Sequence, residues 1–318
     1  MKYYLAPLEG VTTINLRNTF EKYFHSVDKY YIPFLEPHNH SLKNKQEKEI
    51  LPINNKLNHK LVPQIISKDS DNTIWLINKL AELGYDEVNL NFGCPSRTVT
   101  TKSKGSGILD NIELLDKYLN DIFNNTDIKI SIKMRLGLHD TSKFKDIINI
   151  LNKYDILELI IHPRTGDDQY IGNLRLEYLD QLNELTNIPI IYNGECNSHE
   201  DIEYIEKRFP FINGIMLGRG LLERPFLLND YDESVCKESV KSYYNELATL
   251  SINEFGWGVA KFYLKQLLVY LIKGFDCPIK LTKKLFKSST FEEFNNIVLE
   301  IFNTCPIKKE ESGIKKFL

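Results

Sequence analysis

Residues 87–99 read EVNLNFGCPSRTV, a short strand-like run that ends in an abrupt turn. Val88 and Leu90 alternate with polar residues, as in a strand. The run stops at Gly93-Cys94-Pro95, because proline cannot continue a hydrogen-bonded ladder. The turn places the thiol of Cys94 at the tip of the strand. A lone cysteine there is either a small buried residue or a group that faces a ligand.

Strand-like runs recur eight times and are mostly separated by helix-like stretches. The strands are expected at residues 3–6, 29–34, 61–65, 87–91, 128–135, 157–162, 188–193 and 212–217. Helices are expected at residues 13–25, 70–83, 109–123, 142–154, 176–185 and 198–208, whereas 36–58 reads mostly as loop. This alternation predicts an α/β fold, a (β/α)8 TIM barrel. A doubly wound open sheet is the weaker alternative, since no GxGxxG motif is present.

The pattern changes beyond residue 220. Helices are expected at 238–250, 259–272 and 291–303, with a further short one at 279–286. We therefore predict two domains, a barrel over residues 1–230 and a small all-helical domain over 231–318. The net charge is −6 over residues 1–232 and +3 over 233–318. This asymmetry indicates a polyanionic partner for the helical part.

Cysteine usage and hydropathy exclude several protein classes. Five cysteines without a CxxC pair argue against a disulfide framework or a zinc site, so we expect no metal. Free thiols are typical of a reducing compartment, and we expect a cytoplasmic protein. No apolar run is long enough to span a membrane. We read no signal peptide at the start and take a monomer as the expected state.

Active sites of such barrels lie at the carboxyl ends of the strands. Here those ends carry Pro7-Leu8-Glu9, Gln64, Asn91 and Cys94, Lys133 and Arg135, His162 and Arg164, Asn193-Gly194-Glu195, and Gly218-Arg219-Gly220. The glycine-rich ends of the last two strands, with the guanidinium of Arg219, predict a phosphate cradle. The ligand could be a flavin mononucleotide or a sugar phosphate. Lys133 is then either a cation for that ligand or the partner of a carboxylate such as Glu9.

Seven motifs in order resemble those of the flavin-dependent tRNA-dihydrouridine synthases, in their bacterial form. They are LAPLEGVT (5–12), NFGCPSRTV (91–99), KGSG (104–107), IKMRLG (132–137), HPRT (162–165), IYNGE (191–195) and MLGRG (216–220). The resemblance implies an FMN-holding barrel, NADPH as the transient reductant, tRNA as the substrate and a helical RNA-binding domain. It implies that the product is 5,6-dihydrouridine.

The resemblance also assigns roles to residues. FMN would be held by Pro7, Leu8, Glu9, Gln64, Lys133, His162, Asn193, Gly194, Glu195, Gly218 and Arg219. Asn91, Arg135 and Arg164 would lie near the substrate, and Cys94 would be the catalytic acid. Leu8 stands where the family usually has Met, and Glu195 where Asp is common; both changes are mild. Reduction of a uracil needs a hydride at C6 and a proton at C5. A thiol, with a pKa of about 8.5, is protonated at neutral pH and can supply that proton.

Lysines are concentrated in the helical part. Lys261 and Lys265, and likewise Lys280 and Lys284, are four residues apart and would share a helix face. Such a stripe suits RNA phosphates, although it could equally be a solvated face. Two other functions remain open from the sequence. One is an FMN barrel that acts on dihydroorotate, and the other is a noncatalytic RNA-binding barrel.

Overall fold

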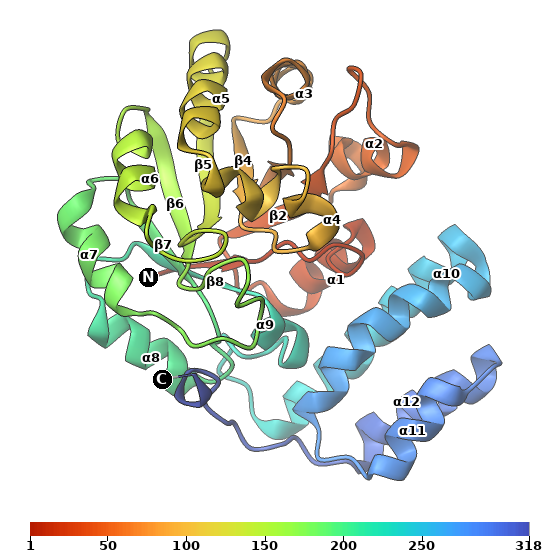
Figure 1. Cartoon of the computed structure of the whole chain (residues 1–318). Coiled ribbons are helices and arrows are strands. Elements are labelled where there is room, and N and C mark those ends of the chain that lie inside the picture. The colour runs from red at the N-terminus through yellow and green to blue at the C-terminus, as the bar shows by residue number, and fades with distance from the viewer. Residues whose placement is uncertain (318) are drawn as a thin grey trace.

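The computed structural model describes residues 1–317 and shows eight parallel strands around a closed barrel (Figure 1). The strands are Lys2–Leu5 (β1), Lys29–Leu35 (β2), Lys60–Ile65 (β3), Glu87–Phe92 (β4), Lys129–Arg135 (β5), Ile156–His162 (β6), Ile190–Asn193 (β7) and Gly214–Leu217 (β8). β1 pairs with β8, which closes the sheet. The predicted TIM barrel is confirmed, and the open sheet is excluded.

Helices cover the outside of the barrel. They are Ile14–Phe24 (α1), Asn44–Ile50 (α2), Ser70–Glu82 (α3), Arg97–Thr100 (α4), Ile112–Asn125 (α5), Phe144–Leu151 (α6), Glu177–Leu185 (α7), His199–Arg208 (α8) and Arg219–Glu223 (α9). Capping side chains explain several starts, because each accepts a backbone N–H that the helix leaves free. Asp69 accepts from the N–H of Asn72 at 2.9 Å, and Asn111 from that of Leu114 at 2.9 Å.

Most of residues 36–58 is loop, as expected, but two short helices lie within the stretch. This stretch contains α2 and a 3-10 turn at Pro52–Asn54. Helix α2 is mostly charged, and only Glu49 and Ile50 at its end are buried. The Glu49 carboxylate lies 2.9 Å from the buried Arg17 guanidinium of α1. A tertiary ion pair therefore anchors a helix that has too little apolar surface to be recognised from its sequence.

The helical part consists of Glu233–Leu271 (α10), Ile279–Lys287 (α11) and Phe291–Thr304 (α12). Gly256 interrupts α10 with a φ of 71°, a backbone conformation that favours glycine. The two helices expected at 238–250 and 259–272 are the two arms on either side of this break. Tyr243 of the first arm packs edge-on against Phe20 and Phe24 of α1. The barrel and the helical part thus share one apolar core.

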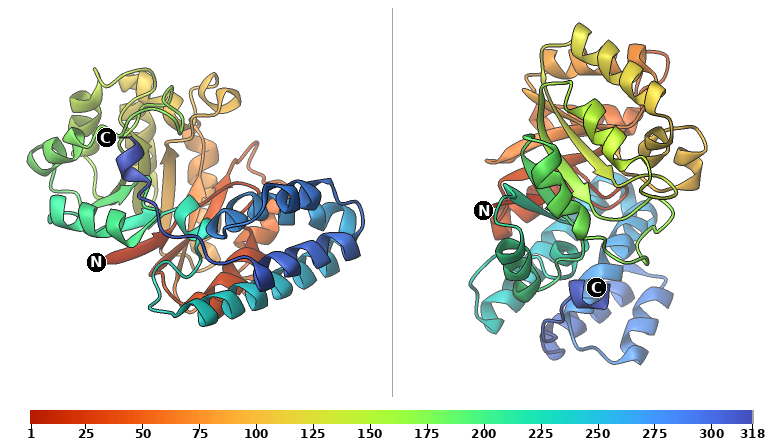
Figure 2. Two further views of the ribbon diagram at one scale, coloured as in Figure 1. Left: turned by 90° about the horizontal axis from the view of Figure 1, so that it is seen from below. Right: turned by 60° about the vertical axis from the view of Figure 1, so that its left-hand side comes forward.

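After α12 the chain returns to the barrel, where its dark blue end lies beside green helices (Figure 2). The Asp201 carboxylate of α8 accepts the N–H groups of Gly313 at 2.8 Å and Ile314 at 3.2 Å. The N–H of Leu174 donates to the carbonyl of Phe317 at 3.1 Å. Residues 312–317 therefore contact the barrel. None of the helices within residues 1–317 is long and apolar enough to cross a membrane.

Candidate active site

A cavity of about 360 Å³ opens at the carboxyl ends of the strands. All eleven residues expected to hold FMN border it, namely Pro7, Leu8, Glu9, Gln64, Lys133, His162, Asn193, Gly194, Glu195, Gly218 and Arg219. Asn91, Cys94 and Arg135 border it too, whereas Arg164 does not. Barrel closure explains this gathering, because it brings strand ends that are far apart in sequence around one mouth.

Cys94 lies on a turn that is held from two sides. Asn91 Oδ1 accepts the N–H groups of Gly93 at 3.0 Å and Cys94 at 2.9 Å. The Cys94 carbonyl accepts the N–H of Ser106 at 3.0 Å. Gly105 has a φ of 56°, and a Cβ there would lie 2.7 Å from that carbonyl, so only glycine fits. The KGSG motif therefore forms the platform of the Cys94 turn.

The sulfur of Cys94 is protonated, as a thiol, at neutral pH. Partial burial raises the pKa of Cys94, and the Glu9 carboxylate acts in the same direction. The backbone N–H of Ser96 opposes this shift without cancelling it. A raised pKa disfavours a thiolate nucleophile and suits a group that releases a proton late.

Three basic residues line the wall next to Cys94. Burial, helped by repulsion from Arg135, lowers the pKa of Lys133 to about 7. Burial, together with repulsion from nearby cations such as Arg135 and Lys133, lowers the pKa of His162 well below its usual value, so His162 is neutral. Arg135 stays charged and is held by the carbonyls of Gly93 at 3.0 Å and Thr165 at 2.7 Å. The wall therefore combines a fixed cation, a titratable amine and a neutral imidazole.

Two arginines share one carboxylate at the ends of β6–β8. Glu195 Oε1 pairs with Arg164 at 2.5 Å and also with Arg219. Two cations and one anion leave a net charge of +1, which suits an anionic ligand. A Cβ on Gly220 would overlap the Cys196 carbonyl, so the two loops can only meet through glycine.

Arg164 is fully buried and does not border the cavity, so the expectation that it lies near the substrate is wrong. Its Nε donates to the Gly172 carbonyl at 2.6 Å, and its guanidinium lies 4.4 Å from the Phe317 ring centroid. Arg164 also lies 3.2 Å from His162 Nε2 and pairs with Glu195, so it supports both side chains from inside the core. The sequence shows only its place after β6, where loop residues can face either the mouth or the core.

Three aromatic or polar residues at the mouth were not anticipated. Tyr170 lies between two guanidiniums, with its ring centroid 5.3 Å from Arg135 and 4.8 Å from Arg219. Gln266 and Tyr270 of α10 also border the cavity. No motif marks Tyr170, because it lies in a loop. The two α10 residues reach the site only through the docking of the helical part on the barrel.

The expected lysine stripe is divided in the structure. Lys261 Nζ donates to the Ser288 carbonyl at 2.5 Å, and Lys265 Nζ to the Phe286 carbonyl at 2.6 Å. Both ammonium groups thus satisfy carbonyls at the carboxyl end of α11. Lys280 and Lys284 are exposed on α11.

Within residues 1–317, no group of three His, Cys, Asp or Glu side chains could hold a metal ion.

Solved structures resemble this chain in fold. An old yellow enzyme homologue from Zymomonas mobilis matches with a TM-score of 0.51 at 13% identity, covering 70% of this chain and 86% of that one. The old yellow enzyme from Trypanosoma cruzi matches with a TM-score of 0.51 at 9% identity, covering 78% and 93%. At such low identity the likeness shows a shared barrel architecture alone.

Sequence relatives are closer. A tRNA-dihydrouridine synthase B from Pasteurella multocida (strain Pm70) is 29% identical over 178 residues, 56% of this chain and 53% of the relative. A tRNA-dihydrouridine(16) synthase from Pseudomonas syringae pv. tomato is 32% identical over 46% of each chain. The matches thus span about half the length of these two relatives. A tRNA-dihydrouridine(16) synthase from Neisseria meningitidis serogroup B is 26% identical over 74% of each chain.

The family model described as dihydrouridine synthase (Dus) matches residues 4–254. That match includes the second half of β1, all of β2–β8, the Cys94 turn and nearly all of the first arm of α10. Because it covers well over half of the 318 residues, the chain belongs to the dihydrouridine synthase family.

Proposed function

We propose that this protein is a tRNA-dihydrouridine synthase, which reduces a uridine of tRNA to 5,6-dihydrouridine with FMN and NADPH. One observation carries the proposal most directly. A thiol with a raised pKa, that of Cys94, borders a cavity that also presents Lys133, Arg135 and neutral His162. Reduction of a uracil needs a proton donor that stays protonated at neutral pH, and Cys94 meets that requirement.

The residues around the cavity fit FMN. The loops after β7 and β8 approach each other through Gly220, and their Arg164-Glu195-Arg219 cluster keeps a positive charge for a phosphate. Leu8 and Met216 supply apolar surface for a flat ring system, and the Gln64 amide can donate to it. Lys133 would face its ring edge. A sugar phosphate would leave the apolar part of this cavity uncovered.

FMN, when bound and reduced, supplies the hydride that uracil C6 receives. The residues of the chain do the rest. Cys94 holds the proton that C5 receives, and the Asn91 side chain fixes the Cys94 turn. Arg135 stays charged and attracts the carbonyl edge of the base. Neutral His162 can donate a hydrogen bond without adding a further charge.

The helical part, residues 231–318, would hold the RNA while the barrel, residues 1–230, does the chemistry. A base must leave the RNA stack to enter a cavity of this kind. Tyr270 and Gln266 of α10 border the cavity and would contact nucleotides beside the target. Since no GxGxxG motif is present, NADPH would visit the cavity transiently. We expect a monomer that works in the cytoplasm.

The direct test is an assay with unmodified tRNA transcripts. We expect the purified protein to bind FMN, to oxidise NADPH faster when tRNA is added, and to increase the mass of one nucleoside by two hydrogens. Dihydroorotate, the substrate of the rival FMN barrel, should not reduce the bound FMN. A protein that binds tRNA but takes up no FMN would refute the proposal and favour a noncatalytic RNA-binding barrel.

Two lysine pairs separate RNA binding from folding. Replacing the exposed Lys280 and Lys284 by alanine should reduce the salt dependence of tRNA affinity, by a slope of about 1 per lysine. Replacing Lys261 and Lys265 should instead lower the free energy of unfolding by about 0.5–1.5 kcal/mol for each lost hydrogen bond. Salt titrations of tRNA binding and denaturant unfolding measure the two effects. An unchanged slope in the first variant would argue against phosphate contacts by α11.

A further inference from the structure

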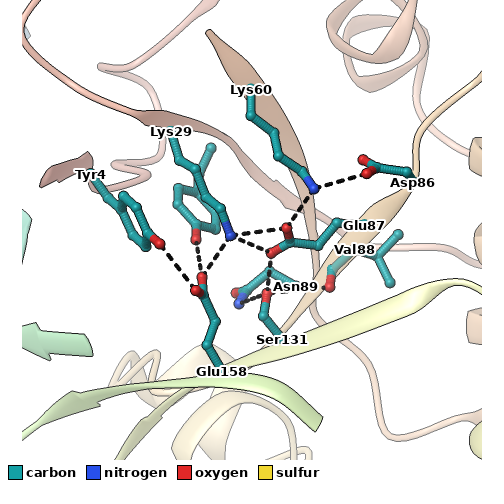
Figure 3. A network of polar contacts seen from close by, with 10 residues as sticks. Tyr4, Lys29, Lys60, Asp86, Glu87, Val88, Asn89, Ser131 and Glu158 are labelled. Carbon is teal, nitrogen blue, oxygen red and sulfur yellow. Dashed lines mark hydrogen bonds and ion pairs between the residues drawn. The ribbon is translucent and has the colours of Figure 1, made fainter. Parts of the chain in front are cut away.

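The bottom of the barrel interior holds a buried cluster of charges (Figure 3). Lys29 Nζ lies 2.9 Å from a carboxylate oxygen of Glu87 and 2.9 Å from one of Glu158. Lys60 Nζ lies 3.0 Å from Glu87 as well. The Glu87 side chain is completely buried, so these two ammonium groups hold its position and its charge.

A chain of hydrogen bonds leads from Glu87 toward the cavity. The Ser131 hydroxyl donates to Glu87 Oε1 at 2.9 Å, and Asn89 Nδ2 donates to Ser131 Oγ at 3.0 Å (Figure 3). Gln64 Nε2 then donates to Asn89 Oδ1 at 2.8 Å. Asn91 Nδ2 donates to Gln64 Oε1 at 2.8 Å. The last link is Asn91 Oδ1, which accepts the N–H groups of Gly93 and Cys94.

Every donor in this chain points toward Glu87. The two backbone N–H groups of the Cys94 turn require an oxygen, which fixes the Asn91 amide. The Ser131 hydroxyl donates to the Glu87 carboxylate at 2.9 Å in preference to the Val88 carbonyl at 3.4 Å, because the charged acceptor is nearer and stronger. Between these ends, Gln64 and Asn89 have one orientation that leaves no donor facing a donor. Aligned links of this kind polarise one another in a low-dielectric interior.

The pattern of β4 explains how the chain arises. Residues two apart in a strand point to the same face, so Glu87, Asn89 and Asn91 all face the barrel interior. The intervening Val88 and Leu90 pack under the helices. Gln64 and Ser131 come from β3 and β5, and both are paired in register with Asn89. Gln64 and Asn91 border the cavity, whereas Asn89 and Ser131 do not.

We propose that Asn89 and Ser131 are positioning residues, which link Glu87 to the Gln64 amide and so brace the Asn91 side chain that holds the Cys94 turn. Gln64 then presents its second N–H hydrogen, rather than its oxygen, to the cavity. If Ser131 loses its hydroxyl, Asn89 loses its acceptor and can turn over. With Asn89 turned over, the Gln64 amide could no longer hydrogen-bond to both Asn89 and Asn91. The catalytic consequence of this inference, though not its structural content, rests on the proposed function.

The test is hydrogen exchange at the N–H groups of Gly93 and Cys94, measured by mass spectrometry. Ser131→Ala, which removes one hydroxyl and little volume, should speed exchange there by about tenfold, the equivalent of one lost hydrogen bond. Asn89→Ala, which removes the amide between Ser131 and Gln64, should speed this exchange by at least the same factor. Val62→Ala is the matched control, because Val62 is buried in the same barrel interior. It should leave this exchange within about twofold of wild type.

A second readout is the visible absorption of FMN bound to each protein. Ser131→Ala should shift that absorption, because the Gln64 amide would no longer present a fixed N–H hydrogen to the cavity. Val62→Ala should leave the absorption unchanged. Equal exchange and equal spectra in Ser131→Ala and Val62→Ala would overturn the positioning role. Exchange depends on neither FMN nor RNA. A tRNA that gains no dihydrouridine would therefore overturn the proposed function alone.

Discussion

Replacing Cys94 by alanine should remove most of the turnover with tRNA while FMN stays bound. General acids typically contribute about 10²–10⁴-fold to a rate, so the expected loss lies in that range. Cys94→Ser is the sharper variant, because it keeps the size of the side chain but replaces the thiol with a far weaker acid. The rate should be followed under single turnover, as dihydrouridine formed per enzyme after reduction with NADPH.

The pH dependence of Cys94 gives a second check. Burial raises the pKa of this thiol, so the wild-type rate should hold through neutral pH and decline as the pH rises through that raised pKa. The Cys94→Ala variant should lack this decline. Cys277→Ala, in the helical part, is the control for loss of a thiol elsewhere and should keep its activity. Full turnover in Cys94→Ala would refute the role of Cys94 as the acid.

Replacing Glu195 by glutamine should both destabilise the protein and weaken FMN binding. The Glu195 carboxylate is the counter-charge of Arg164, whose side chain is 0% exposed. Breaking a buried pair from one side leaves an uncompensated charge, which costs about 3–5 kcal/mol in the free energy of unfolding. Arg219 would lose the same partner and its fixed place at the mouth. Denaturant unfolding and FMN titration measure the two effects.

The control is an exposed pair of the same chemistry. Arg208 and Asp180 lie 2.5 Å apart, with 47% and 43% of their side chains exposed. Solvent screens such a pair, so Asp180→Asn should lower the free energy of unfolding far less than Glu195→Gln does. FMN affinity should not change in that variant. Losses of similar size in Glu195→Gln and Asp180→Asn would contradict the buried role assigned to Glu195.

The sequence predicted the barrel because eight apolar runs recur with helices between them, a pattern that depends on local periodicity alone. It did not reveal α2 inside the stretch read mostly as loop, because this helix buries few residues and its Glu49 pairs with Arg17 of another helix. It did not anticipate residues 312–317 on the barrel, since Asp201 is more than one hundred positions away. Local patterns carry no information about such pairings.

The candidate site shows the same division. Glycine, cysteine and basic residues at strand ends could be recognised in the sequence, because barrel geometry puts every strand end at one mouth. The direction in which each of these side chains points could not be predicted from the sequence. Arg164 lies two residues from His162, yet it points into the core. Lys261 and Lys265 are predicted to contact RNA, and the structure shows that their ammonium groups donate to helix carbonyls.

By itself, the sequence determined the order of the strands, the thiol at the end of β4 and the glycines that let loops meet. These are properties of short segments and their spacing. Only the tertiary structure decided that the Cys94 thiol has a raised pKa and that Glu195 serves two arginines. It also decided that Asn89 lies in line between Ser131 and Gln64. The physical reason is that burial and hydrogen-bond partners come from strands brought together by barrel closure.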